Sequence, residues 1–179
     1  MPTRPCPANR PEAIACRSWA PIDASPGLFV VPAASPIRGV QDLRGRAVAL
    51  GTRGSGFTIM GRTVLQGSGL DPDHDITPIL LDDAGEGAAQ VLDGRAAALW
   101  GASLGWPGFR TLADAPGGAR FFGPAPEAIP TILALRASMR RLTVPPASFR
   151  GQDAAIETCL LYTSPSPRDR TRSRMPSSA

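Results

Sequence analysis

The sequence predicts an α/β fold with a parallel or mixed sheet flanked by helices over residues 27–158. Short apolar runs alternate with helical patterns along this segment, and turn residues separate them. The first run, Leu28–Val31, ends at Pro32, and a later run, Arg46–Leu50, leads into a glycine-rich loop. A segment of about 130 residues can bury one modest core, so a single unit is expected.

Each further element is predicted from its periodicity and its stop signals. The helix over 57–66 has apolar residues at helical spacing and ends at Gly67 and Gly69. Arg120–Phe122 has the composition of a strand, and 127–141 has the spacing of a long helix. The remaining expected elements are a helical turn over 39–43, strands over 76–81, 96–100 and 142–144, and helices over 85–92 and 109–113.

Both ends of the chain differ in composition from this segment. Residues 1–26 are proline-rich with little apolar periodicity, so we expect them to be disordered or out of frame. They lack the apolar stretch of a signal peptide. Residues 159–169 and 174–179 resemble one translated frame of adapters used in high-throughput sequencing libraries. That resemblance implies that 159–179 is an artefactual, disordered tail and that the natural gene is interrupted near Thr158.

The net charge gives little support to a nucleic-acid partner. The chain carries a formal charge of +4, but residues 27–158 hold equal numbers of arginine and acidic residues, and the basic excess lies at the two ends. The acidic residues between Asp71 and Glu86 do not have the spacing of a calcium loop and predict a solvated face. His74 has no nucleophile or base arranged around it and is assigned no role. Residues 27–158 supply no paired acid and base and no activated nucleophile, so we expect a binding protein with no catalytic residue, and we predict no metal or cofactor.

The loop from Gly51 to Gly56 is the first candidate site. It follows a predicted strand and opens a predicted helix, whose N-terminus favours an anion because its N–H groups are free. Ser55 either caps that helix or donates its hydroxyl to a carboxylate. Arg53 either pairs with a carboxylate or is a solvated surface charge. The chain lacks the lysine of a P-loop, and Ile59 stands where a dinucleotide fingerprint needs glycine. A tight turn with a capping serine is an equally good interpretation.

The loop from Gly101 to Gly108 is the second candidate. It follows a predicted strand that should end at the same sheet edge, where open α/β sheets bind ligands. Trp106 could supply an apolar wall and Ser103 a polar contact. The alternative is that the tryptophans pack against the edge of the core, which we expect more for Trp100 than for Trp106.

Four segments together resemble the TAXI-type solute-binding proteins of TRAP transporters. They are 40–51, the loop Gly54–Ser55–Gly56, 92–98, and 144–153 with the sequence VPPASFRGQD. The resemblance implies a type II periplasmic-binding-protein fold with two lobes, of which Asp42–Gly123 would be the second. It also implies a periplasmic protein that captures a small carboxylate, such as an amino acid or dicarboxylate, for the membrane subunits of a TRAP transporter. The chain is then an incomplete fragment, which we expect to bind ligand poorly by itself.

The ligand-binding residues are assigned from the two loops and from this resemblance. Phe57 stands where many members have threonine, which removes one hydroxyl from the implied site. Two other functions stay open on the same fold: an enzyme of thiamine-precursor synthesis, and a ligand-sensing domain of a regulator. The predicted ligand-binding residues are Thr52, Arg53, Gly54, Ser55, Gly56, Phe57, Gly101, Ser103 and Trp106.

Overall fold

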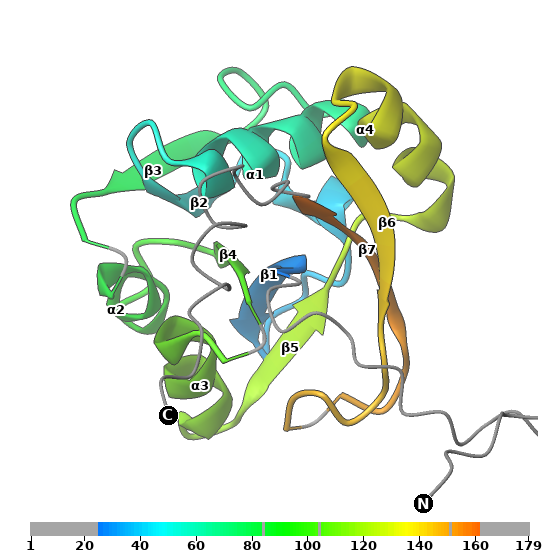
Figure 1. The fold of residues 1–179 in the computed structure, drawn as a ribbon. Coiled ribbons are helices and arrows are strands. Elements are labelled where there is room, and N and C mark those ends of the chain that lie inside the picture. Colours follow the sequence, from blue (N-terminus) through cyan, green and yellow to red (C-terminus); the bar gives the residue numbers. More distant parts are fainter. Residues whose placement is uncertain (1–24, 84, 104, 151, 162–179) are drawn as a thin grey trace, which may run out of the picture.

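Five strands form a mixed sheet in the order β3-β2-β4-β1-β5, with helices on both faces (Figure 1). The computed structural model describes residues 25–161 except 84, 104 and 151. β2 pairs in parallel with β3 and β4, whereas β1 pairs antiparallel with β4 and β5. The elements are β1 Gly27–Pro32, η1 Val40–Leu43, β2 Ala47–Thr52, α1 Gly56–Gly67, β3 Thr77–Leu81, α2 Glu86–Leu92, β4 Ala98–Ala102, α3 Pro107–Asp114, β5 Ala119–Phe122, η2 Pro126–Ala128, α4 Ile129–Leu135, β6 Met139–Val144 and β7 Ile156–Leu161.

The central strands are buried on both faces, which explains why they are nearly all apolar. In β1, Phe29 and Val31 face α1 and α4, while Leu28 and Val30 face α2 and α3. The predicted fold class, a mixed sheet flanked by helices, is confirmed. The elements expected from residue 28 to residue 92 are also present, with ends displaced by one or two residues.

The helix predicted over 127–141 is wrong in its second half. The chain makes the short turn η2, then α4, which ends at Leu135, and β6 begins at Met139. β6 pairs with β7 over its whole length, from Met139 opposite Leu161 to Val144 opposite Ile156. Hydrogen bonding to the distant strand β7 outweighs the local helical spacing of these residues. A search for periodicity along the sequence cannot detect such a partner.

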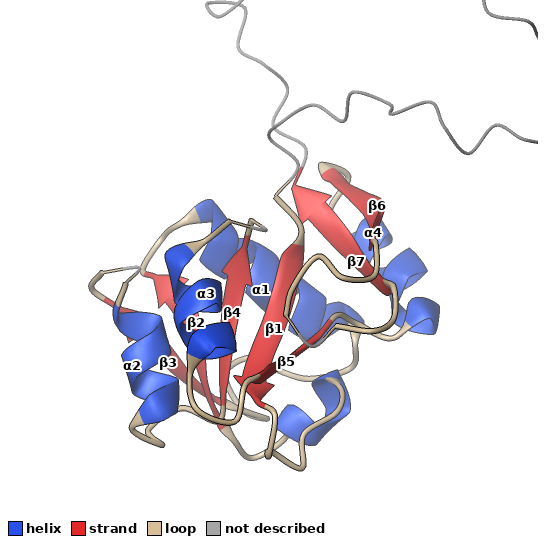
Figure 2. Ribbon diagram, turned by 90° about the horizontal axis from the view of Figure 1, so that it is seen from below, coloured by secondary structure: helices blue, strands red, loops and turns tan. Residues whose placement is uncertain are grey.

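A small second sheet, β6–β7, lies beside the start of β1 (Figure 2). The Thr158 hydroxyl donates to the Gly27 carbonyl, and Pro26 forms an isolated bridge with Leu160. Cys159 is fully buried against the α1 side of the core. The ordered fold therefore extends three residues past the boundary predicted at Thr158. The predicted tail from 162 onward and the predicted N-terminal segment 1–24 lie outside the described residues.

The loop between β6 and β7 contains the VPPASFRGQD segment, and its residues hold it against the main sheet. Gln152 is buried; its amide donates to the carbonyls of Pro145 at 3.0 Å and Ala154 at 2.9 Å. Its side-chain oxygen accepts from the Phe149 N–H at 3.2 Å. The Phe149 ring stacks on Phe121 of β5 with centroids 4.0 Å apart. In this chain the segment thus has a clear structural role.

Candidate functional site

The glycine-rich loop lies where β2 ends and α1 begins, at the sheet edge where β4 also ends. β2 and β4 are parallel neighbours, so their carboxyl ends share this edge, as predicted. The chain turns through Gly51 at φ 106° and Gly54 at φ 74°, conformations that strongly favour glycine. A Cβ at Gly51 would also lie 3.1 Å from the Thr58 hydroxyl oxygen, so this glycine makes room for the side chain that organises the loop.

Thr58 organises the loop from inside the first turn of α1, and it was not among the predicted site residues. Its buried hydroxyl donates to the Thr52 carbonyl at 2.7 Å and lies 3.3 Å from that of Leu50. A hydroxyl has a single proton, so in the 2.9 Å contact between the two hydroxyls Ser55 is the donor. Ser55 also accepts from the Thr58 N–H at 3.1 Å, as the cap of the helix.

The hydrogen bonds of Ser55 favour its capping role, and a ligand contact from its hydroxyl stays a prediction. Its proton is directed to Thr58, so in this conformation Ser55 acts as the helix cap and does not offer a donor outward. The N–H groups of Gly56 and Phe57, in contrast, make no hydrogen bond with any described residue, and both residues are exposed. They are the first two N–H groups of a 12-residue helix. An anion at this edge would therefore be held by main-chain donors and by the positive end of the helix dipole.

Trp100 fixes the same turn from the neighbouring strand. Its indole N–H donates to the Phe57 carbonyl at 2.8 Å, and its ring is 1% exposed. Two glycines make room for this ring: a Cβ at Gly61 would lie 2.9 Å from it, and one at Gly27 would overlap it. The expectation that Trp100 belongs to the core is confirmed, and its indole nitrogen positions the candidate site as well.

The Phe57 side chain and Arg53 are both exposed beside the loop. Phe57 is 45% exposed, and it is one of four large apolar side chains that are exposed in the described part of the chain. The Arg53 guanidinium takes part in none of the ion pairs found among the described residues. Both side chains are therefore free to meet a ligand or the rest of a larger protein.

The second predicted loop is placed differently from the expectation. β4 runs to Ala102, so Gly101 is a buried strand residue opposite Leu28, and the Trp106 ring occupies the space where its Cβ would be. Trp106 packs edge-on to Phe109 with centroids 5.3 Å apart, on the α3 side of the sheet. The first turn of α1 lies on the opposite side.

Ser103 joins this second loop to the entry of β1. It has φ 90°, its N–H donates to the Pro26 carbonyl at 3.3 Å, and its carbonyl accepts from the Trp106 N–H at 3.3 Å. The geometry favours the core-edge interpretation for Trp106, since its ring is engaged with Gly101 and Phe109. Ligand contacts from Gly101, Ser103 and Trp106 stay a prediction.

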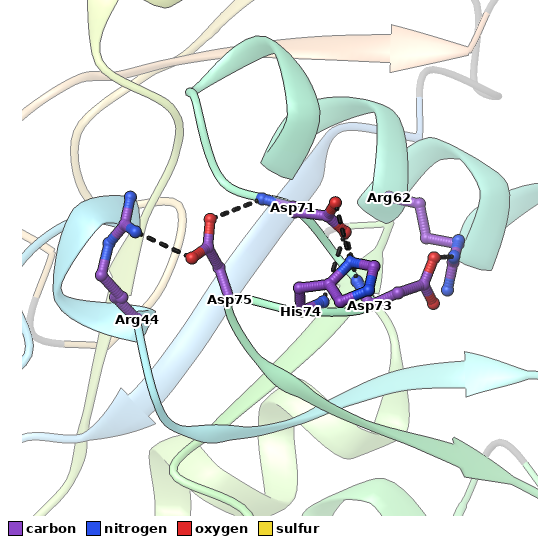
Figure 3. Close-up of polar contacts among 6 residues, drawn as sticks. All are labelled: Arg44, Arg62, Asp71, Asp73, His74 and Asp75. Atoms are coloured by element: carbon purple, nitrogen blue, oxygen red, sulfur yellow. Dashed lines mark hydrogen bonds and ion pairs between the residues drawn. The ribbon is translucent and has the colours of Figure 1, made fainter.

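The loop between α1 and β3 carries the first part of the predicted acidic face, and its charged side chains pair within the loop or with arginines of neighbouring elements (Figure 3). Asp71 accepts from the N–H groups of Asp73 and His74 at 2.8 and 3.3 Å and lies 3.0 Å from the His74 ring nitrogen. Asp73 pairs with Arg62. These side chains are largely exposed, which agrees with a solvated face.

The pairing shifts the ionisation of these groups. Hydrogen bonds from the Asp73 N–H and the His74 ring lower the pKa of Asp71, and the same contact raises the pKa of His74. A hydrogen bond from Arg62 lowers the pKa of Asp73. At the end of the loop Asp75 pairs with Arg44 at 2.7 Å. Polar contacts at the surface thus hold the loop between α1 and β3 in place.

No helix in the described part of the chain has the length and apolar character needed to span a membrane.

Residues 23–141 match the model of the family described as "ABC transporter, phosphonate, periplasmic substrate-binding protein". The chain belongs to this family. The match agrees with the predicted class, which is a periplasmic solute-binding protein of a transporter. Proteins of this matched family are substrate-binding proteins and not enzymes. No curated protein matches the chain.

Several solved structures are similar to the chain. The alkanesulfonate-binding protein SsuA from Xanthomonas axonopodis pv. citri, bound to MOPS, is 28% identical over 55% of this chain and 33% of its own, with a TM-score of 0.43. The aliphatic sulphonate binding protein SsuA from Escherichia coli is 29% identical over 54% and 30%, with a TM-score of 0.43. A TctC solute binding protein from Polaromonas is 14% identical over 81% and 48%, with a TM-score of 0.47. The chain thus spans half or less of the length of each.

Proposed function

We propose that this segment forms one lobe of a periplasmic solute-binding protein and holds the anionic group of a small organic solute. The observation that carries the proposal is the pair of unused N–H groups of Gly56 and Phe57. They lie at a helix N-terminus that Thr58 and Trp100 hold in place. Such a terminus binds an anion without needing a cationic side chain.

The chemistry suits a tetrahedral or planar oxyanion. Two adjacent N–H groups can each donate to a different oxygen of a carboxylate, phosphonate or sulfonate, and the helix dipole adds a favourable field. The family description, which names phosphonate, supports an oxyanion. The resemblance to TAXI proteins favours a carboxylate, such as an amino acid or a dicarboxylate. Arg53, exposed on the same loop, can complete the charge balance from the rim.

The proposed partners are the membrane subunits of a transporter. The family match favours an ABC transporter, whereas the Gly54–Ser55–Gly56 loop with the VPPASFRGQD segment favours a TRAP transporter of the TAXI type. Capture and delivery of a solute are the same in both cases. The genes that neighbour the native locus would decide between the two transporter types.

Calorimetric titration of a longer protein, recovered from the native locus and containing both lobes, tests this proposal. The panel is methylphosphonate, ethanesulfonate, succinate and glutamate, with the uncharged glutaramide as the control. We expect saturable binding of at least one anion and none of glutaramide. The 179-residue chain should bind the same anion far more weakly, because a single lobe buries only part of a ligand. Tight binding of glutaramide would contradict the proposal, and so would the absence of binding by all four anions.

A further inference from the structure

Trp100 in β4 lies between α1 and the start of β1. The five-membered ring of its indole meets α1: the indole N–H donates to the Phe57 carbonyl at 2.8 Å, and a Cβ at Gly61 would lie 2.9 Å from that ring. The six-membered ring lies against Gly27, the first residue of β1, where a Cβ would overlap it. One side chain thus touches both the turn that carries the candidate anion site and the start of β1.

The indole ring is also held on its other sides. Phe29, the residue opposite Trp100 in the β1–β4 pair, packs on it with ring centroids 4.7 Å apart. Trp100 is 1% exposed and belongs to the same buried cluster as Met60. Protein interiors are close-packed and barely compressible, so a movement at one edge of a rigid ring is passed to whatever touches the other edge. The indole is therefore a stiff spacer between α1 and β1.

The start of β1 is joined directly to β7, as Figure 2 shows. The Gly27 carbonyl accepts from the Thr158 hydroxyl, and Pro26 forms an antiparallel bridge with Leu160. We call these four residues the β1–β7 joint. Both ends of the described segment, 25–161, lie at this joint, so the chain on either side of the segment is attached there.

We propose that Trp100 connects the anion site to the β1–β7 joint, so that a bound anion changes the contacts at the joint. This inference rests on the proposed function, because it takes the N–H groups of Gly56 and Phe57 as the anion donors. An anion that draws these N–H groups toward itself also moves the Phe57 carbonyl, to which the indole is bonded. The ring then moves against Gly27, whose carbonyl bonds to Thr158.

The connection acts in both directions. Coupling between two sites is reciprocal, so a change at the β1–β7 joint must also alter anion binding. In a longer protein the remaining chain attaches at this joint. Trp100 is then the positioning residue through which that remaining chain responds to the bound solute.

Amide and indole NMR of the 179-residue chain tests the connection. The probes are methylphosphonate, ethanesulfonate, succinate and glutamate, added one at a time, and the uncharged glutaramide is the control. We expect at least one anion to shift the amides of Gly56 and Phe57. The same saturation curve should then be followed by three further resonances, which are the Trp100 indole N–H and the amides of Gly27 and Thr158. Glutaramide should shift none of them.

Trp100→Phe breaks the connection in the middle. It removes the indole donor and one of the two rings, so the anion should still shift the Gly56 amide but no longer those of Gly27 and Thr158. The same variant identifies the Trp100 indole resonance. Phe122→Leu is the matched control, because it trims another aromatic ring of the same core cluster and should leave every anion-induced shift in place.

Gly61→Ala tests the same connection without any ligand. Its added Cβ presses on the indole from the α1 side, so the amides of Gly27 and Thr158 should shift relative to the parent chain. Gly39→Ala, whose Cβ meets nothing within 4 Å, should leave both amides unchanged. This comparison decides the question even where Trp100→Phe does not fold.

Three results would contradict the inference and leave the anion site standing. The first is an anion that shifts Gly56 without shifting Gly27 and Thr158. The second is a Trp100→Phe variant in which the anion still shifts Gly27 and Thr158, and the third is a Gly61→Ala variant in which both amides stay in place. A lack of any shift at Gly56 up to about 100 mM of each anion would instead contradict the anion site itself, and this inference with it.

Discussion

Replacing Thr58 by valine should destabilise the fold through the loop that precedes α1. The variant keeps the shape of the buried side chain but removes the hydroxyl that bonds the Thr52 carbonyl at 2.7 Å. It also leaves the Ser55 proton without its acceptor. Two lost hydrogen bonds, both involving groups that are only partly reached by water, together cost about 2 kcal/mol. For a fold of this size that lowers the melting temperature by about 4 to 8 °C.

Thr63→Val is the matched control within the same helix. Thr63 is also buried, but its hydroxyl donates at 2.9 Å to the Ile59 carbonyl, which lies one turn back along the helix. That carbonyl is already an acceptor in the helix ladder, so losing the hydroxyl leaves nothing unpaired and should cost less than about 0.5 kcal/mol. The assay is thermal and urea unfolding followed by circular dichroism. Equal losses for the two variants would refute the reasoning about the loop.

Three further predictions follow from other contacts. Gly61→Ala should cost about 1 to 3 kcal/mol in urea unfolding, because its Cβ would press on Trp100, whereas Gly39→Ala, with nothing within 4 Å, should be nearly neutral. His74 should titrate above its ordinary pKa of 6.5 by NMR, and Asp71→Asn should lower its pKa toward that value, while Asp73 and Asp75 still raise it. Because the folded-state pKa is raised, any stability from this pair is fully present below pH 6.5 and is lost as the pH rises through the folded pKa. Burial raises the pKa of Cys159 to about 11, so iodoacetamide at pH 8 should label it only after unfolding. Peptide mass spectrometry separates Cys159 from Cys6 and Cys16, and labelling of Cys159 in the native chain would mean that β7 is not docked as described.

The strand–loop–helix unit could be predicted from sequence because its signals are local. Glycines mark the turn, Ser55 stands at the cap position, and the apolar residues of α1 recur at helical spacing. The shared sheet edge followed from the alternation of strands and helices. The role of Thr58 could not be predicted, because its hydroxyl acts on carbonyls of the preceding strand that become neighbours only after the chain folds back.

The errors arose where distant contacts decide the local structure. The first half of β6, residues 139–141, continues the helical spacing in sequence but pairs with β7, which begins twelve residues after β6 ends. Gly101 looked like a loop glycine, yet it lies in β4 because Leu28 pairs with it and the Trp106 ring covers it. One signal for the shorter α4 was present: Pro130 favours a helix start at that point, later than the predicted start at Glu127.

The most direct test of the anion site removes one main-chain donor from the first turn of α1. Gly56 is the first residue of α1, where proline is tolerated, and Ser55 before it already has the extended backbone that proline requires. In the longer two-lobe protein, Gly56→Pro should weaken binding of the anion found by titration by about tenfold or more, while Gly56→Ala, which keeps the N–H, should bind about as well as the parent. If Gly56→Pro binds the anion as tightly as Gly56→Ala does, the N–H groups of this helix do not hold the solute and the proposed function loses its basis.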